Sequence, residues 1–214
     1  MGFYGDIIAE TMLRYICFFI RGVNAVPRHY MFTREQILDA ALTLTRQRGI
    51  GALTARALGE QLGTSPKPIF SYFDSMEAVQ AAVSQAAAQE YSRRIETAMH
   101  AGVYPPYKAS GMAYMRFALE ERELFKLLFM RDRSGEGSID DRESVRPILN
   151  LLQQKLGLDE AQAARFHGEM WLFVHGIATA LATGYLPWDE AQVSWMLSDV
   201  YFGLRHRFCQ PEQP

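Results

Sequence analysis

The stretch that decides the fold covers residues 54–73 and reads Thr-Ala-Arg-Ala-Leu-Gly-Glu-Gln-Leu-Gly-Thr-Ser-Pro-Lys-Pro-Ile-Phe-Ser-Tyr-Phe. Its first half predicts a short helix, because Thr54 can cap the free N–H groups and Leu58 and Leu62 lie one turn apart on a common face. Gly63 follows at the position where a helix commonly ends in a left-handed residue. The first half therefore has both a start and a stop signal.

The second half of this stretch predicts another short helix, which begins at Ser65. Pro66 and Pro68 fall in its first turn, where a helix N–H has no intrahelical partner and proline is tolerated. Ile69 and Phe73 are four residues apart and are expected to face the core. Two short helices joined by a tight glycine turn have the form of a helix-turn-helix reader of the DNA major groove. A helical hairpin without a DNA partner is the alternative on this segment alone.

The flanking sequences extend the pattern to a unit of three helices. Residues 33–48 predict an amphipathic helix with Ile37 and Leu44 on one stripe. After the second short helix, Asp74-Ser-Met-Glu77 predicts a capping box with Asp74 as the cap. This box begins a long alanine-rich helix that runs to His100.

The region from Thr33 to about Val79 resembles the DNA-binding domain of the TetR family of transcriptional regulators. The resemblance is carried by Ile37-Leu-Asp-Ala-Ala41, Gly49, Leu53-Thr54, Leu58, Leu62-Gly63, Phe70-Ser-Tyr-Phe73, Asp74-Ser75 and Glu77. Met76 stands near the position where the family usually has a lysine. The resemblance implies a helix-turn-helix domain over residues 31–79 that binds double-stranded DNA. The expected DNA-binding residues are Thr54, Arg56, Ser65, Lys67, Phe70, Ser71 and Tyr72.

The composition is that of a helical globular protein with little net charge. The 214 residues are 49% hydrophobic and 12% aromatic, enough to bury the core of one or two domains. Alternating β-branched runs are almost absent, so we expect an all-α fold. Residues 1–76 hold 8 Lys and Arg against 6 Asp and Glu, and residues 77–214 hold 14 against 18. The small positive excess of the first part predicts modest non-specific DNA affinity.

Residues 80–208 predict a second helical domain for ligand binding and dimerisation, joined to the first by the long helix, with residues 209–214 as a tail. The expected helices after the long one cover residues 109–122, 123–130, 145–156, 159–181 and 189–208. The polar stretch 131–141 is the best candidate for a mobile loop. Asp159 and Asp189 each precede a Gln by three residues, which predicts two capping boxes. Gly184-Tyr-Leu-Pro187 predicts a turn that makes the last two helices antiparallel.

The stretch 170–181 is apolar on nearly every side, so a helix here needs cover on more than one face. A second copy of the chain is the most natural cover. Trp171, His175 and Gly176 resemble the Trp-x3-His-Gly signature of one class of TetR-family C-terminal domains. In that family the last two helices usually form a four-helix dimer interface. The expected interface residues are Phe173, Ile177, Leu181, Trp195 and Val200.

The same resemblance implies that the middle helices enclose an inducer pocket. Methionine and aromatic side chains adapt to hydrophobic ligands, although most of them belong to the core by default. His175 can equally be a hydrogen-bonded core or interface residue. The expected ligand-binding residues are Tyr107, Met112, Met115, Phe125, Met130, Trp171 and His175.

The first 30 residues contain an apolar run over residues 11–20 that is too short to span a bilayer and lacks a cleavage site behind it. Three interpretations stay open: a packing helix, a surface anchor, and an accessory or artefactual extension upstream of a natural start at Met31. We favour the last. Cys17 and Cys209 form no CxxC motif, so no disulfide scaffold is expected and a reducing cytosol is the default location.

No motif indicates catalysis, a cofactor or a metal site. The HExxH, Walker, GxGxxG and GxSxG patterns are missing, and His167 and His175 are too far apart for ligation from adjacent turns. The sequence therefore predicts a cytoplasmic, homodimeric repressor without enzyme activity or a membrane partner. It would bind a palindromic operator and be released by a small hydrophobic or amphipathic ligand that tilts the long helix. A helical protein-interaction module and an enzyme without a familiar motif are the alternatives.

Overall fold

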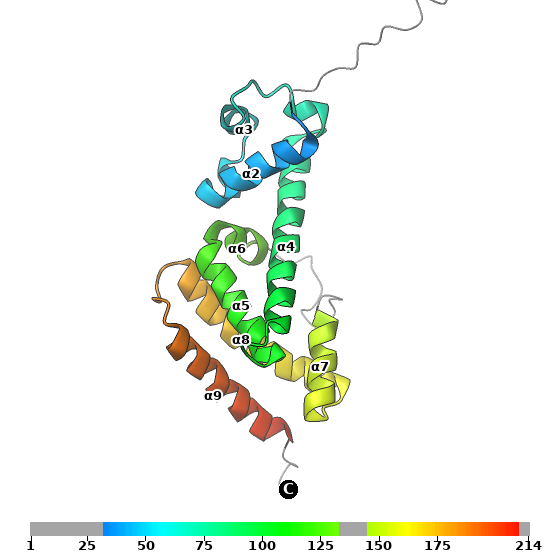
Figure 1. The fold of residues 1–214 in the computed structure, drawn as a ribbon, viewed down its shortest axis with the longest axis vertical. Coiled ribbons are helices and arrows are strands. Elements are labelled where there is room, and N and C mark those ends of the chain that lie inside the picture. The colour runs from blue at the N-terminus through cyan, green and yellow to red at the C-terminus, as the bar shows by residue number, and fades with distance from the viewer. Residues whose placement is uncertain (1–31, 133–144, 210–214) are drawn as a thin grey trace, which may run out of the picture. The chain divides into compact units, whose positions relative to one another are not determined.

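The computed structural model describes residues 32–132 and 145–209. Within these ranges the chain is helical and contains no strand, which confirms the all-α expectation (Figure 1). The helices are α2 (Arg34–Arg48), α3 (Ala55–Gln61), α4 (Met76–His100), α5 (Pro106–Glu120), α6 (Arg122–Phe129), α7 (Arg146–Leu156), α8 (Glu160–Ala182) and α9 (Glu190–Cys209). All of them belong to one compact unit, Arg34–Pro214. The expectations for residues 1–30, and for most of 131–141, lie outside the described residues.

The first helices follow the sequence signals closely. Ile37 and Leu44 of α2 are buried, and the helix is followed by Gly49 with a φ of 77°. The side chain of Thr54 caps α3 by accepting a hydrogen bond of 3.2 Å from the backbone N–H of Ala57. The predicted helix starts and stops are confirmed here because they depend on contacts between near neighbours in the chain.

The segment after α3, residues 65–73, differs from the helix expected there. We call it the recognition segment. It contains turns and a short 3₁₀ helix over Ile69–Ser71, held by N–H groups of Ile69 and Ser71 that donate to the carbonyls of Pro66 and Pro68 (3.1 and 3.2 Å). Pro68 disfavours the helical conformation of the residue before it, Lys67, so a regular α-helix does not begin at Ser65. Ile69 and Phe73 are nevertheless buried, as expected.

A glycine that the sequence reading did not single out sets the packing of the recognition segment. A Cβ at Gly59 would lie 2.9 Å from the carbonyl oxygen of Thr64 and 3.2 Å from the backbone nitrogen of Pro66. The N–H of Thr64 also donates to the carbonyl of Gly59 over 2.9 Å. The backbone of α3 therefore touches the following turn directly, and only glycine leaves room for that contact.

The cap of α4 is Ser75 rather than Asp74. The Ser75 hydroxyl accepts a hydrogen bond of 3.3 Å from the N–H of Ala78, while Asp74 is exposed. The helix begins one residue later than the expected box, so the cap moves by one residue as well. The hydroxyl of Ser75 also lowers the pKa of Glu77, with a smaller contribution from the Glu77 backbone.

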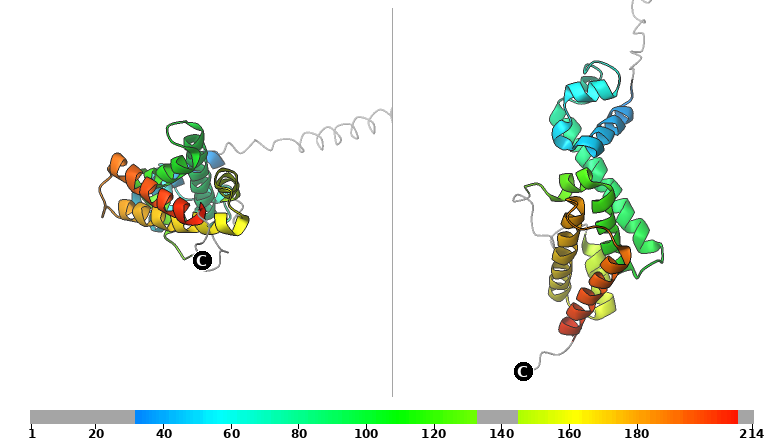
Figure 2. Two further views of the ribbon diagram at one scale, coloured as in Figure 1. Left: turned by 90° about the horizontal axis from the view of Figure 1, so that it is seen from below. Right: turned by 90° about the vertical axis from the view of Figure 1, so that its left-hand side faces the viewer.

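The body of the protein is built around α5, which packs against α4, α6, α8 and α9. It begins at Pro106, earlier than expected, because prolines at the N-cap and first positions are compatible with a helix start. Asp159 and Gln162 form the predicted capping box of α8. Asp189 accepts a hydrogen bond of 2.9 Å from the N–H of Gln192 at the start of α9. Figures 1 and 2 show that α8 and α9 run in opposite directions, as predicted.

Candidate functional sites

The expected DNA-binding residues lie on α3 and the recognition segment, mostly with exposed side chains. Phe70 is 49% exposed, an unusual position for a large apolar ring. Tyr72 is partly buried, and the other six are exposed or at the exposed edge of the segment. Arg56 forms an exposed ion pair with Glu60 over 3.0 Å, which costs little to break. These side chains are brought together on one short stretch of chain.

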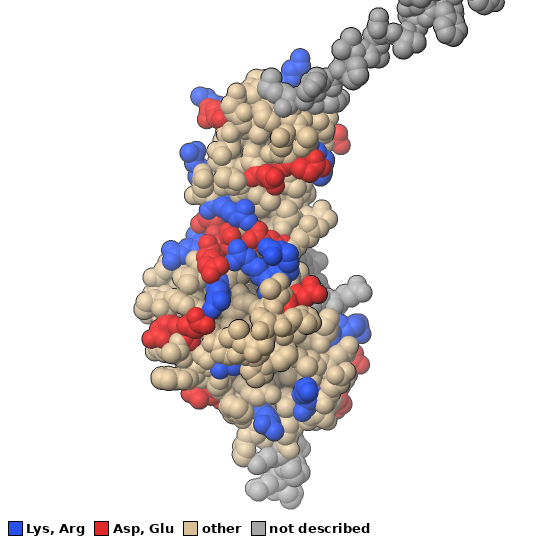
Figure 3. Space-filling view, viewed as in Figure 1, with Lys and Arg blue, Asp and Glu red and all other residues tan. Residues whose placement is uncertain are grey.

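This surface carries little positive charge of its own. Lys67 is the only lysine or arginine between Arg56 and Arg93 in the sequence. In the space-filling view, charged side chains of both signs gather where α2 meets α6 and are sparser toward the helix-turn-helix end (Figure 3). Attraction to DNA phosphates therefore has few sources near the recognition segment.

The gathered charges form a group that we call the arginine–glutamate cluster: Arg46, Glu90, Arg94, Glu120 and Glu121. It joins α2 of the DNA-binding domain to α4 and to the α5–α6 junction of the body. Arg46 donates to Glu90 and, over 3.0 Å, to Glu121. Arg94 donates to Glu90, Glu120 and Glu121 over 2.8 to 2.9 Å. Burial alone would lower the pKa of Arg94, but these partners outweigh burial and raise it.

The acidic residues at the α5–α6 junction are not simply a solvated face. The Glu121 side chain is only 14% exposed and binds two arginines. A carboxylate oxygen of Glu123 lies close to Gly49, where a Cβ would come within 2.7 Å of it. The partners are far apart in sequence, so residue spacing gave no sign of them.

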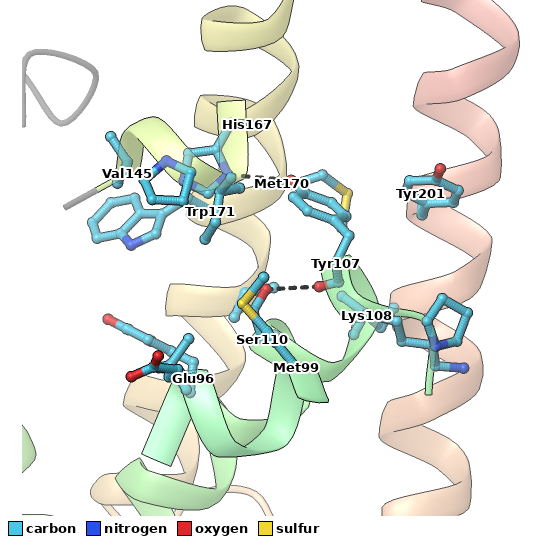
Figure 4. Close-up of a pocket in the computed structure, with 18 of the residues that line it drawn as sticks. Glu96, Met99, Tyr107, Lys108, Ser110, Val145, His167, Met170, Trp171 and Tyr201 are labelled. Carbon is cyan, nitrogen blue, oxygen red and sulfur yellow. Dashed lines mark hydrogen bonds between the residues drawn. The ribbon is translucent and has the colours of Figure 1, made fainter. Parts of the chain in front are cut away.

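A cavity of about 590 Å³ lies in the body, between α4, α5, α7, α8 and α9 (Figure 4). This volume is in the range that holds drug-sized ligands. The lining is largely apolar and aromatic. Its main apolar members are Tyr91, Ile95, Met99, Tyr107, Tyr114, Phe129, Ile148, Met170, Trp171, Val174, Leu197, Tyr201 and Phe202.

Polar groups occupy defined places on this lining. The Tyr107 hydroxyl and His167 Nδ1 share a hydrogen bond of 3.2 Å, and the Ser110 hydroxyl donates to the Tyr107 carbonyl over 2.7 Å (Figure 4). Lys108 Nζ donates to the Ser198 hydroxyl over 2.8 Å. Burial raises the pKa of Tyr107, with a smaller contribution from Tyr201. The phenol therefore stays protonated at neutral pH and can act as a donor.

Only two of the expected ligand-binding residues, Tyr107 and Trp171, lie on the lining. Along α5 the lining residues repeat at helical spacing as Tyr107, Ser110, Gly111 and Tyr114, which leaves Met112 and Met115 on other faces. Phe125 is buried in the core, and Met130 is exposed beside the end of α6. Met112, Met115, Phe125 and Met130 therefore lie away from this cavity.

His175 fits the alternative interpretation of a hydrogen-bonded core residue. Its Nδ1 and the Tyr114 hydroxyl are 2.9 Å apart, and its ring stacks on Trp171 with centroids 4.6 Å apart. It does not line the cavity. His167, which the sequence analysis considered only as a metal ligand, lines the cavity instead. Helical spacing alone does not reveal which face of a helix meets a cavity.

The expected interface residues divide into two groups. Trp195 is 70% exposed, and Phe173 and Val200 are partly buried. Leu181 is fully buried and Ile177 nearly so within the single chain. Those two side chains pack in the chain's own core, which leaves little of their surface for contact with a second copy. Leu172 on α8 and Phe202 on α9 are exposed apolar side chains that the sequence reading missed.

Over 32–132 and 145–209, none of the helices has the length and apolarity needed to cross a membrane. In the same part of the chain, no three His, Cys, Asp or Glu side chains are grouped as metal ligands would be.

Two family models match the chain. The model described as bacterial regulatory proteins of the tetR family matches residues 37–83. The model described as a tetracyclin repressor-like C-terminal domain matches residues 107–199. Together they cover the helix-turn-helix region and most of the body, including much of the cavity.

Individual proteins agree with these matches. An uncharacterized HTH-type transcriptional regulator of Mycobacterium tuberculosis is 24% identical over 195 residues, which is 86% of this chain and 85% of the relative. A solved structure described as a transcriptional regulator of the TetR family, from Vibrio parahaemolyticus, aligns with a TM-score of 0.54 at 18% identity. That alignment covers 79% of this chain and 96% of the other, and it supports the likeness of fold.

Proposed function

This chain belongs to the TetR family of DNA-binding transcriptional regulators, and on that premise we propose that it is a homodimeric repressor released from its operator by a small molecule in the cavity. The observation that carries the proposal is the course of α4. This helix begins directly after the recognition segment and lines the cavity at its other end, with Tyr91, Ile95 and Met99. One continuous helix thus joins the proposed DNA contacts to the proposed ligand contacts.

The recognition segment is proposed to enter the major groove, with Lys67, Ser71 and Tyr72 nearest to the DNA. Thr54 and Arg56 at the start of α3 would reach the backbone or a guanine edge. Two subunits would bind half-sites one helical turn or a small multiple apart, about 34 Å for one turn. The weak positive charge near Lys67 favours a role for both subunits on one operator, since each alone contacts few phosphates.

The second subunit is proposed to cover the exposed apolar side chains of α8 and α9. Leu172, Trp195 and Phe202 are 65%, 70% and 58% exposed in the single chain. Exposed apolar side chains of this size on neighbouring helices are typical of an interface. A two-fold arrangement would also match a palindromic operator. We place the dimer in the cytoplasm, where it would meet DNA.

Ligand binding is proposed to act on the DNA-binding domain through α4 and α6. A ligand would contact Tyr91 on α4 and Phe129 on α6, both on the cavity lining. Glu90 and Arg94 of α4 hold Arg46 of α2 through the arginine–glutamate cluster, and α6 packs against α2. A tilt of α4 would change the distance between the recognition segments of a dimer. The ligand shifts the equilibrium only if it binds the tilted state more tightly.

The direct test is a mobility-shift experiment with the DNA upstream of the chain's own coding sequence, followed by selection from genomic fragments. We expect a shifted band that the Lys67→Ala variant weakens without loss of fold. A protein-interaction module that has lost DNA binding predicts no shift with any fragment. That result would contradict the proposal.

A further inference from the structure

We propose that the cavity selects an amphipathic monoanion, a molecule with an apolar body and one negatively charged head group that binds at Lys108. A carboxylate is the simplest such head group. The inference rests on the proposed function, because it names the ligand class of the same cavity.

Lys108 is the cation on the lining that has only neutral partners. Its Nζ donates to Ser198 over 2.8 Å and lies 5.1 Å from the centre of the Tyr104 ring. No carboxylate among residues 32–132 and 145–209 forms an ion pair with it. Arg94, which is also partly buried, binds three glutamates. A partly buried charge without a counter-ion is costly, and an anionic ligand would supply one.

The surroundings of Lys108 add to its preference for an anion. The Ser198 hydroxyl donates to the Ser194 carbonyl over 2.9 Å, so toward Lys108 it acts as an acceptor and does not neutralise the charge. Lys108 also lies in the first turn of α5, whose N-cap Pro105 provides no side-chain cap. The positive end of the helix dipole therefore acts on the same end of the cavity.

The rest of the lining determines the form of the ligand. Met170, Val174 and Leu197 provide an apolar surface for an uncharged body. In Figure 4 Lys108 and Tyr201 lie on one side of the cavity and Glu96 lies on the other. A second negative charge at that side would be repelled by Glu96, which favours a monoanion over a dianion.

A cationic ligand is the competing possibility, because the Glu96 carboxylate forms no ion pair with residues 32–132 or 145–209; the neighbouring His100 bonds only its backbone carbonyl. Glu96 is exposed, however, whereas Lys108 is partly buried. Water screens an exposed carboxylate strongly, so its attraction for a cation is weak. Of the two histidines on the lining, His100 is exposed, and His167 is buried and bonded to Tyr107. The cavity should therefore prefer an anion, because water screens the charge of Lys108 less than that of Glu96.

The test uses three probes with the same apolar tail: decanoate, decanol and decyltrimethylammonium, each below its critical micelle concentration. Their affinities for the full chain are measured by isothermal titration calorimetry. We expect decanoate to bind more tightly than decanol by about tenfold or more, the effect of one charge-assisted contact. Decyltrimethylammonium is expected to bind more weakly than decanol.

Three variants test whether Lys108 is the source of the preference for decanoate over decanol. Lys108→Met should reduce the decanoate-to-decanol ratio to about one while leaving decanol affinity unchanged. Lys108→Arg should retain the ratio. Lys155→Met removes the same charge from an exposed position on α7 outside the lining and should change nothing. Circular dichroism and thermal unfolding confirm that each variant is folded.

Each outcome has a separate meaning. Equal affinities of the wild-type protein for decanoate and decanol, or an unchanged ratio in Lys108→Met, would overturn the anion inference and leave the cavity as a ligand site. Failure of all three probes to bind would overturn the inference together with the ligand part of the proposed function. None of these results would bear on operator binding, which the mobility-shift experiment tests separately.

Discussion

The recognition segment and the ligand cavity are built from contacts of very different range. The segment is held by hydrogen bonds between near neighbours, such as that from Thr64 to Gly59. The cavity depends on pairs such as Tyr107 with His167 and Lys108 with Ser198, which are 60 and 90 residues apart. Damage to the segment should therefore stay local, whereas the shape of the cavity depends on the packing of the whole body. The cluster around Arg46 connects the two regions.

Gly59→Ala should have the largest effect of the variants, because it should abolish operator binding and leave ligand binding in the cavity unchanged. Its Cβ would meet backbone atoms of Thr64 and Pro66, which cannot rotate away as a side chain can. Overpacking of this kind costs about 1–3 kcal/mol or more, and it would fall on the recognition segment. We expect operator binding to be lost in a mobility-shift assay while decanoate affinity stays unchanged. Gly51→Ala, where the new methyl meets nothing within 4 Å, is the matched control. Loss of cavity binding in Gly59→Ala would show that the regions are not separable.

Trp195→Glu should produce a monomer whose cavity is intact. The side chain is exposed in the single chain, so the charge harms only an interface with a second copy. Light scattering after size-exclusion chromatography measures the mass. Ile177→Glu, in contrast, should give unfolded or insoluble protein, because Ile177 is buried in the chain's own core. A stable dimer from Trp195→Glu would place the interface on another surface.

Lys67→Ala should weaken operator binding by about 1–3 kcal/mol and reduce the salt slope by about one, as expected for loss of a single phosphate or base contact. The side chain is exposed and forms no hydrogen bond or ion pair with the residues that the structure describes, so thermal unfolding should not change. Affinities measured at several salt concentrations test this. An unchanged slope would exclude Lys67 from contact with phosphate.

Arg46→Met should have a small effect on stability and an informative effect on regulation. It leaves Glu90 and Glu121 without one partner each, but both still bind Arg94, so we expect a loss of about 1 kcal/mol in the free energy of unfolding. Ligand should then release the operator less effectively, because α2 is less firmly held to α4. Arg116→Met breaks a more exposed pair with Glu190 and serves as the control. Equal ligand response in both variants would remove the cluster from the coupling.

The difference between contacts among near neighbours and contacts among residues far apart in the chain also explains which features the sequence could predict. Thr54, Gly63 and the Asp159–Gln162 box act on residues a few positions away, so local patterns located them correctly. The prolines of the recognition segment were noticed, but the restriction that Pro68 places on the preceding residue was not, and only a short 3₁₀ helix forms there. The cap of α4 is Ser75, one residue after the expected Asp74. Local sequence patterns do not fix the end of a helix to within one residue.

The cavity could not be located in this way. Which face of α5 lines it depends on how that helix is rotated against α4, α8 and α9, and the spacing of Met112 and Met115 carries no information about that rotation. Neither Lys108 nor His167 was predicted as a cavity residue, because the place of each becomes clear only through a partner on another helix. The pairing of Glu121 with Arg46 is a further example.

The central claim is that the cavity and the operator site are coupled, and linkage tests it most directly. The operator Kd is measured with and without saturating decanoate, and the decanoate Kd with and without saturating operator. We predict that each ligand weakens the other by the same factor, about fivefold or more, and that Lys108→Met abolishes the effect at the same decanoate concentration. Decanoate-saturated protein that binds the operator with an unchanged Kd would contradict the account.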